Sequence, residues 1–224
     1  MTEQTITEKC THTLEVPGAV LTYDVRRGTG DGPVLLLIGS PMGAAGFGTL
    51  SGFFADRTVV TYDPRGVERS RRTDGAPTAT PEEHADDLSR LIATIDAGPV
   101  DLFASSGGAV NALALVARHP GTVRTLVAHE PPLAALVPDR EFALAACRDI
   151  HDTYQRSGMG AGMATFIAIV THKGPVTAEY LDRPAPDPAM FGLPTEDDGS
   201  RDDVLLGQNL LSCTAFEPDV EALR

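Results

Sequence analysis

Short apolar segments alternate with helical patterns through the first 132 residues. The segments 12–16 and 20–26 alternate apolar and polar side chains on either side of Pro17-Gly18, which predicts a β-hairpin. The continuous apolar segment 33–38 predicts a central strand buried on both faces. Further strands are predicted over 58–62, 99–105 and 123–128. This alternation is typical of an α/β fold with a mostly parallel central sheet and flanking helices.

Two helices are predicted between these strands. The first begins near Thr80, its expected N-cap, and runs to about Asp96. Its apolar stripe for packing on the sheet consists of Leu88, Leu91, Ile92 and Ile95. The second helix, over 109–118, follows the strand 99–105 with only a tight turn between them, so strand, turn and helix share a few residues.

The alternation ends at residue 133, and the rest of the chain is predicted to be helical. Helices are expected over 139–156, 158–172 and 202–211. The intervening segment 183–201 is rich in Pro, Asp and Gly and predicts an exposed, mobile loop. We therefore expect a core formed by residues 1–132, an inserted helical part over 133–215, and a return toward the core over 216–224.

Composition narrows the classes of function. The net charge is −13, and the 18 Lys and Arg residues form no basic patch, which argues against nucleic-acid partners and anionic membrane surfaces. The N-terminus lacks the features of a secretory signal, and no apolar run approaches a membrane span, so we expect a soluble, cytoplasmic protein. The three cysteines lie far apart and are expected to be reduced thiols, with no metal or cofactor site.

Ser106 is the leading candidate for chemistry. It lies in Ala104-Ser105-Ser106-Gly107-Gly108, where small neighbours allow a strained strand-to-helix turn that presents the hydroxyl above the sheet. The pentapeptide alone is a weak signal, but its position at a helix N-terminus favours negative charge. Gly107 N–H is thus one expected donor to an oxyanion, and Ser40 N–H, in the loop after the central strand, is the other.

Three ordered segments resemble the α/β-hydrolase superfamily: 36–41, 62–70 and the turn at Ser106. The resemblance implies an acyl-transfer enzyme whose variable helical cap, here 133–215, covers the active site. Three residues depart from common family choices: Ile38 where many members have His, Glu68 where Gly is common, and Ala104 for the first Gly of the turn. None of these changes removes a catalytic atom, because the oxyanion donor is a backbone N–H.

The base that would activate Ser106 is not evident. The resemblance implies an acid, most often after the next strand, and a His after the last strand. Of the six histidines, His129 lies nearest the expected edge of the sheet, while His84 is expected on an exposed helix. Glu130 stands where some members carry the acid. We expect that the last strands are absent from this chain, and that a C-terminal fragment or a second chain completes the fold.

Serine esterase activity on a small-molecule substrate is the main hypothesis. Two alternatives stay open: a catalytically silent ligand-binding homologue, and a cofactor-free haloperoxidase or C–C hydrolase that uses the same site. A nucleotide-binding protein is disfavoured, since the turn matches neither GxGxxG nor a P-loop. A substrate pocket or plain packing would explain the apolar residues of the helical part: Phe142, Met159, Met163, Phe166, Ile167 and Met190.

Overall fold

The computed structural model describes residues 9–224, which form two compact units. Unit 1 contains the chain up to Ala76, Pro81–Pro131 and Pro218–Arg224. Unit 2 contains Pro77–Thr80 and Pro132–Glu217.

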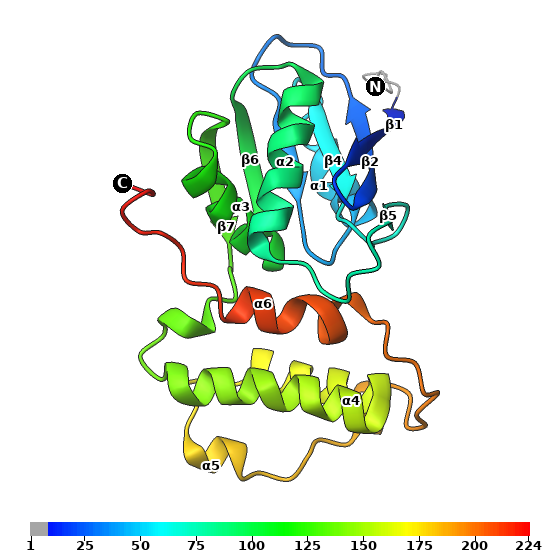
Figure 1. Cartoon of the computed structure of the whole chain (residues 1–224), viewed down its shortest axis with the longest axis vertical. Coiled ribbons are helices and arrows are strands. Elements are labelled where there is room, and N and C mark those ends of the chain that lie inside the picture. The colour runs from blue at the N-terminus through cyan, green and yellow to red at the C-terminus, as the bar shows by residue number, and fades with distance from the viewer. Residues whose placement is uncertain (1–8) are drawn as a thin grey trace, which may run out of the picture. The chain divides into compact units, whose positions relative to one another are not determined.

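Unit 1 is built on a seven-stranded sheet in the order β1-β2-β4-β3-β6-β7, with β5 paired to β2 (Figure 1). The strands are β1 (Lys9–Val16), β2 (Ala19–Arg26), β3 (Leu35–Ile38), β4 (Val59–Asp63), β5 (Arg71–Arg72), β6 (Val100–Ser105) and β7 (Val123–His129). Strands β4, β3, β6 and β7 are parallel, and β2 is antiparallel to its three partners. The predicted α/β class with a mostly parallel centre is confirmed.

Helices lie on both faces of this sheet. Figure 1 shows α2 (Pro81–Ile95) in front of the strands and α1 (Gly48–Gly52) behind them. Helix α3 (Gly107–Arg118) packs beside α2 and against β6 and β7. The central strands β3 and β4 are buried along their whole length, as expected for strands covered on both faces.

Two elements of unit 1 have no counterpart in the predicted set. One is the pair formed by the 3₁₀ turn η1 (Ala44–Phe47) and α1, a glycine-rich stretch with weak helix propensity. Phe47 fixes it on the sheet, where it packs with the buried side chains of Leu35, Leu37 and Val59. The other is the two-residue strand β5, which is too short to leave a pattern in the sequence.

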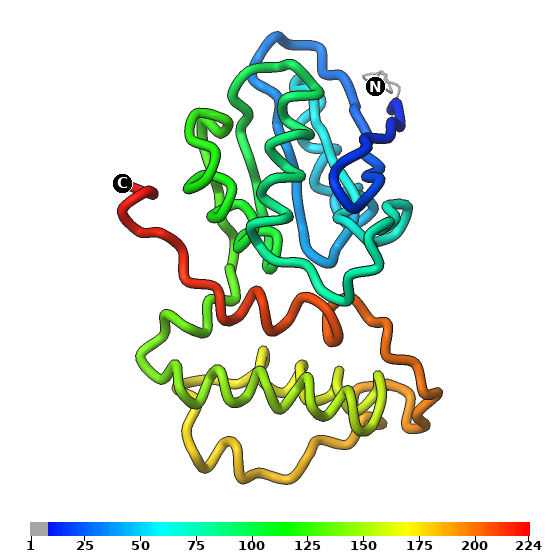
Figure 2. Tube along the Cα trace, viewed as in Figure 1, coloured from blue at the N-terminus to red at the C-terminus, as the bar shows by residue number. Residues whose placement is uncertain are grey.

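Unit 2 is helical, and its main element is α4 (Arg140–Val170). Gly158 breaks α4 with a φ of 81° and a ψ of −172°, so the two predicted helices stay distinct. The second part runs back beside the first (Figure 2). This close pairing requires Gly162, because a Cβ there would lie 2.7 Å from Cβ of Tyr154. The remaining elements are η2 (Ala134–Leu136), α5 (Ala178–Leu181), η3 (Pro188–Phe191), η4 (Val204–Asn209) and α6 (Leu210–Thr214).

Most of the apolar residues singled out in the helical part serve packing. Met163 and Phe166 lie against a cluster formed by Ile150, Tyr154, Leu206 and Leu210. Phe142 belongs to a second cluster, whereas Met190 is 79% exposed. The predicted loop 183–201 is mostly exposed, but it includes the short 3₁₀ turn η3.

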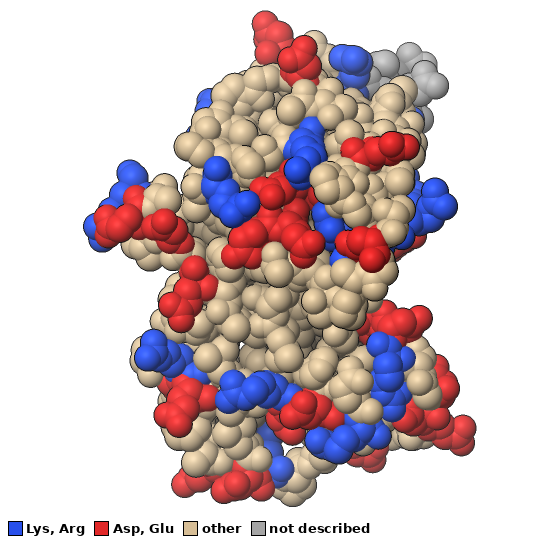
Figure 3. All heavy atoms as spheres, viewed as in Figure 1, with Lys and Arg blue, Asp and Glu red and all other residues tan. Residues whose placement is uncertain are grey.

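Charged side chains of both signs are interspersed over the face shown in Figure 3, including along α4. Across residues 9–224, no helix is both long and apolar enough to cross a membrane. The same residues contain no group of three or more His, Cys, Asp or Glu side chains arranged to hold a metal ion.

Candidate active site

Ser106 is the single residue between the last residue of β6, Ser105, and the first residue of α3, Gly107. It is exposed and has a φ of 56° and a ψ of −128°, a conformation that costs a residue with a Cβ of order 1–3 kcal/mol. Two backbone hydrogen bonds hold it there. Ser106 N–H donates to the His129 carbonyl at 3.0 Å, and the Ser106 carbonyl accepts from Ala109 N–H at 2.9 Å.

This strain predicts a difference between two substitutions. Ser106→Gly should be more stable than Ser106→Ala by about 1 kcal/mol, because glycine relieves the positive φ but adds entropy to the unfolded chain. Urea unfolding of both variants measures the difference. Equal stabilities, or a more stable alanine variant, would mean that this backbone conformation is not strained.

The start of α3 lies against the loop that follows β3. A Cβ built on Gly108 would stand 2.8 Å from both Cα and the carbonyl carbon of Gly39, so only glycine allows this approach. The two segments expected to supply oxyanion donors are therefore neighbours, and Ser40 is buried with 4% of its surface exposed. The N-terminus of α3 adds a partial positive charge beside Ser106.

Asp63, at the end of β4, anchors the same loop. Its fully buried carboxylate accepts a hydrogen bond from Ala44 N–H at 2.8 Å and another from Arg69 Nε at 2.6 Å. Arg69 also donates from both Nη atoms to Asp24, each at 3.1 Å. These hydrogen bonds to Asp24 and Asp63 raise the pKa of the Arg69 guanidinium, so it stays charged. The network ties the loop 39–44 to the turn 63–70.

A second ion pair stabilises the turn from inside. Arg65 and Asp87 are buried, with 4% and 0% of their surfaces exposed, and they form a two-pronged pair with both N–O distances at 2.8 Å. Neither residue was singled out from the sequence. The signal available was Arg65 within the segment 62–70 and an aspartate one residue before the predicted stripe of α2.

His129 lies one strand over from Ser106, but its contact is with the adjacent serine. Nδ1 of His129 is 3.3 Å from Oγ of Ser105, and its ring stacks on Phe103 with centroids 5.9 Å apart. The register explains this contact, since Ser105 and His129 are direct partners in neighbouring parallel strands. Within residues 9–224, the Ser106 hydroxyl has no hydrogen-bond partner.

Glu130 follows His129 at the end of β7. It is exposed and has a φ of 50°, an uncommon value for a residue other than glycine. Its carboxylate forms no ion pair with another described residue.

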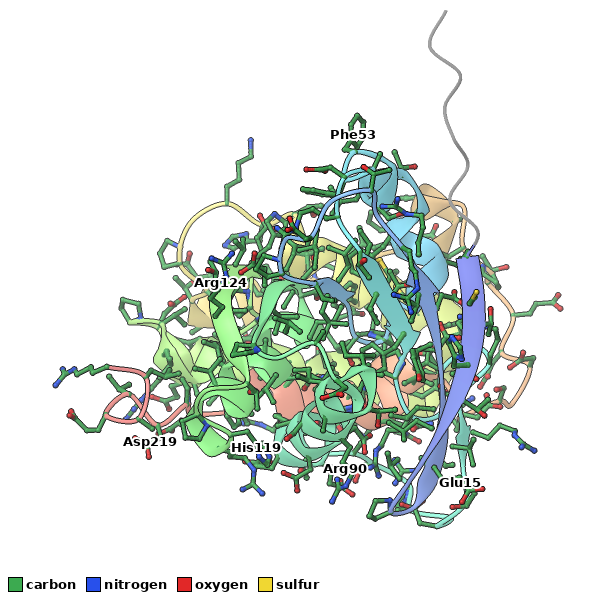
Figure 4. The ribbon with its side chains drawn as sticks, turned by 90° about the horizontal axis from the view of Figure 1, so that it is seen from above. Glu15, Phe53, Arg90, His119, Arg124 and Asp219 are labelled. Carbon is green, nitrogen blue, oxygen red and sulfur yellow. The ribbon has the colours of Figure 1, made fainter. Side chains whose placement is uncertain are left out.

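The other histidines have local partners of their own. His119, at the end of α3 (Figure 4), is 2.7 Å from Asp86 through its Nε2. His12 stacks on Tyr23 in the hairpin. His151 and His172 hydrogen bond to carbonyl oxygens within unit 2.

The expectation that His84 lies on an exposed face is wrong. Only 2% of its surface is exposed, because it lies one helical turn before Leu88, on the face of α2 that packs inward. Burial, and then the positive charges of Arg65 and Arg72, lower the pKa of His84 to about 3.

This burial makes stability depend on pH. The unfolded chain protonates His84 below about pH 6.5, while the folded chain stays neutral there until about pH 3. The free energy of unfolding should therefore fall as the pH drops below 6.5, by at most about 1.4 kcal/mol per pH unit from this group. Denaturant titrations between pH 7 and pH 5 should show a shallower slope for His84→Leu. Parallel curves for the two proteins would contradict this account.

Comparison with known proteins gives the class. A model of the alpha/beta hydrolase fold matches residues 32–155, which is more than half of the chain and includes the turn at Ser106. The chain therefore belongs to the α/β-hydrolase family.

Particular relatives cover only part of their own length. The uncharacterized hydrolase YraK of Bacillus subtilis (strain 168) is 42% identical over 135 residues, which are 59% of this chain and 49% of that protein. The chain thus spans about half the length of this curated relative.

Solved structures agree on the fold. A "putative epoxide hydrolase" from Pseudomonas aeruginosa gives a TM-score of 0.57 at 23% identity, over 81% of this chain and 62% of that chain. A mutant of a protein with the same description and source gives a TM-score of 0.54 at 26% identity, over 64% and 49%.

Proposed function

We propose that the protein is a serine hydrolase that cleaves a carboxylic ester of a small molecule through an acyl-enzyme on Ser106. The observation that carries this proposal is the position of Ser106. It is an exposed hydroxyl, at a strained positive φ, between a parallel strand and a helix that starts with buried glycines. Such strain persists only where the surrounding structure enforces it, and it is concentrated at functional sites.

The proposed reaction follows from that position. Oγ of Ser106 attacks the ester carbonyl carbon and gives its proton to a base, and the resulting oxyanion accepts hydrogen bonds from Gly107 N–H and Ser40 N–H. Collapse of this intermediate breaks the bond to the alcohol, which leaves with a proton. Water then attacks the acyl-enzyme by the same route and releases the acid. Every step is a proton transfer or an acyl transfer, so the proposal needs no cofactor.

The base is proposed to lie outside residues 1–224. A serine hydroxyl is a weak nucleophile at neutral pH without a neighbouring base, and the described hydrogen bond of His129 is to Ser105. We therefore assign the His and its acid partner to a further C-terminal segment or to a second chain. Glu130 is the alternative acid, because it is exposed at the end of the strand next to β6.

Ester cleavage is favoured over epoxide opening by the chemistry of the nucleophile. If a serine opened an epoxide, the intermediate would be an ether, which has no carbonyl for water to attack. An aspartate would instead form an ester that water can hydrolyse, but position 106 is serine.

Two other candidates keep the same turn. A cofactor-free haloperoxidase or a C–C hydrolase would also use Ser106 and its oxyanion donors. A catalytically silent homologue would bind a ligand without an activated serine. The free cysteines fit a reducing compartment, and we place any of these functions in the cytoplasm.

A paired substrate test separates the reactions. The protein encoded by the complete reading frame is incubated with p-nitrophenyl butyrate and, separately, with styrene oxide. Release of p-nitrophenol without diol formation is the expected result. Diol formation without ester cleavage would overturn the proposal, and failure to cleave any ester of a panel with acyl chains of different lengths would favour the silent homologue.

A further inference from the structure

Unit 2 contains a cavity of its own, of about 150 Å³. It lies between the two parts of α4, the short helix α5 and the segment from Arg183 to Pro186. All of its lining residues belong to unit 2, so it is separate from the segments that carry Ser106. A protein cavity of about this volume is known to bind benzene, which sets the size of a suitable ligand.

Two guanidinium groups line this cavity, those of Arg156 and Arg183. Arg156 Nη2 donates to Thr153 Oγ1 at 3.2 Å. Arg183 donates to the hydroxyl of Tyr180, and its guanidinium carbon lies 3.4 Å from the centroid of the Tyr180 ring. Each guanidinium has five N–H donors, so these contacts leave most of them available.

Neither guanidinium has an acidic partner. Among residues 9–224, Arg156 and Arg183 form no ion pair, whereas Arg65, Arg69 and Arg201 each contact at least one carboxylate within 3.2 Å. Two unpaired arginines beside one cavity are unexpected in a chain of net charge −13. They point to an anion as the ligand.

The rest of the lining limits that anion. Ile150, Ile169 and Leu181 give the cavity an apolar wall, which suits a hydrocarbon body. Asp149 also lines it, so the charges of the lining sum to +1, from two arginines and one aspartate. A single carboxylate balances this charge, while a dianion such as phosphate would be repelled by Asp149.

We propose that this cavity is a binding site for a small monocarboxylate with an apolar body of about the size of a benzene ring. Arg183, held in place by its stacking on Tyr180, and Arg156 bind the carboxylate. The apolar wall binds the ring. This site goes beyond the proposed reaction, because it requires neither Ser106 nor a base.

Isothermal titration of the full chain with sodium benzoate tests the proposal. Arg156→Gln and Arg183→Gln should each weaken binding by about ten-fold or more, since each removes charge-assisted hydrogen bonds. Asp149→Asn should tighten it, because the only negative group of the lining is neutralised. The matched control is Arg148→Gln, an exposed arginine of the same helix outside the lining, which should bind as the wild type does.

Two further ligands sharpen the result. Benzyl alcohol has the ring without the charge, and inorganic phosphate has the charge without the ring, so both should bind more weakly than benzoate. Circular dichroism checks that each variant is folded, and Arg183→Lys replaces an unfolded Arg183→Gln, with weakened binding again expected because lysine lacks the planar fork. Absence of benzoate binding, or equal affinities for the wild type and the folded Arg156 and Arg183 variants, would overturn the proposal.

Discussion

Replacing Ser106 by alanine should lower kcat for ester hydrolysis by on the order of 10⁴–10⁶-fold, the range seen when a catalytic serine is removed. The hydroxyl forms the covalent bond to the acyl group, so no neighbouring group can replace it. The oxyanion donors are backbone N–H groups and remain, which leaves the small residual rate. Initial rates with p-nitrophenyl butyrate, at a concentration well above KM, measure the loss.

The matched control for this experiment is Ser105→Ala. Ser105 is the preceding residue, and its hydroxyl contacts His129 at the end of β6. Removing it should leave kcat within a few-fold of the wild type. If Ser105→Ala lost activity and Ser106→Ala kept it, the nucleophile would have been assigned to the wrong serine.

Arg65→Met should lower the free energy of unfolding by about 3–5 kcal/mol, the usual cost of leaving one member of a buried ion pair without its partner. The partner left behind is Asp87, whose side chain is fully buried. Burial also raises the pKa of the Asp87 carboxyl, so the orphaned group should take up a proton more readily. Urea unfolding at pH 7, with the slope m held common, gives the change.

Two variants complete this test. Arg124→Met breaks a similar pair with Asp101, but Arg124 is 56% exposed, so the free energy of unfolding should change little. The double variant Arg65→Met/Asp87→Leu should recover part of the stability, because no charge is left buried alone. A small effect of Arg65→Met by itself would show that water reaches this pair.

Local patterns carry most of what the sequence predicts of the fold. The hairpin, β3, β4, β6, α3 and β7 follow from apolar runs, Pro-Gly turns and helical periodicity. The sheet order is not local: β4 lies between β2 and β3, and only long-range pairing decides that. The η1 and α1 segment escaped prediction because its helical form depends on Phe47 packing and on the hydrogen bond from Ala44 to Asp63.

The candidate site divides in the same way. A strained turn at Ser106 could be predicted because small residues must surround it, and the structure has a φ of 56° there. The partner of His129 could not be predicted, because it depends on the register between β6 and β7. His84 could have been placed correctly, since it lies four residues before Leu88 on the same helical face. The Asp63 network joins three separate segments, which no local pattern reveals.

Covalent labelling tests the central claim most directly. The protein encoded by the complete reading frame is treated with a fluorophosphonate, digested with trypsin, and analysed by fragmentation mass spectrometry of the peptide between Arg90 and Arg118, which contains both Ser105 and Ser106. We predict one phosphonate adduct, located on Ser106 and absent from Ser106→Ala. Failure to label this protein, or labelling that persists in Ser106→Ala, would contradict the account of Ser106 as an activated nucleophile.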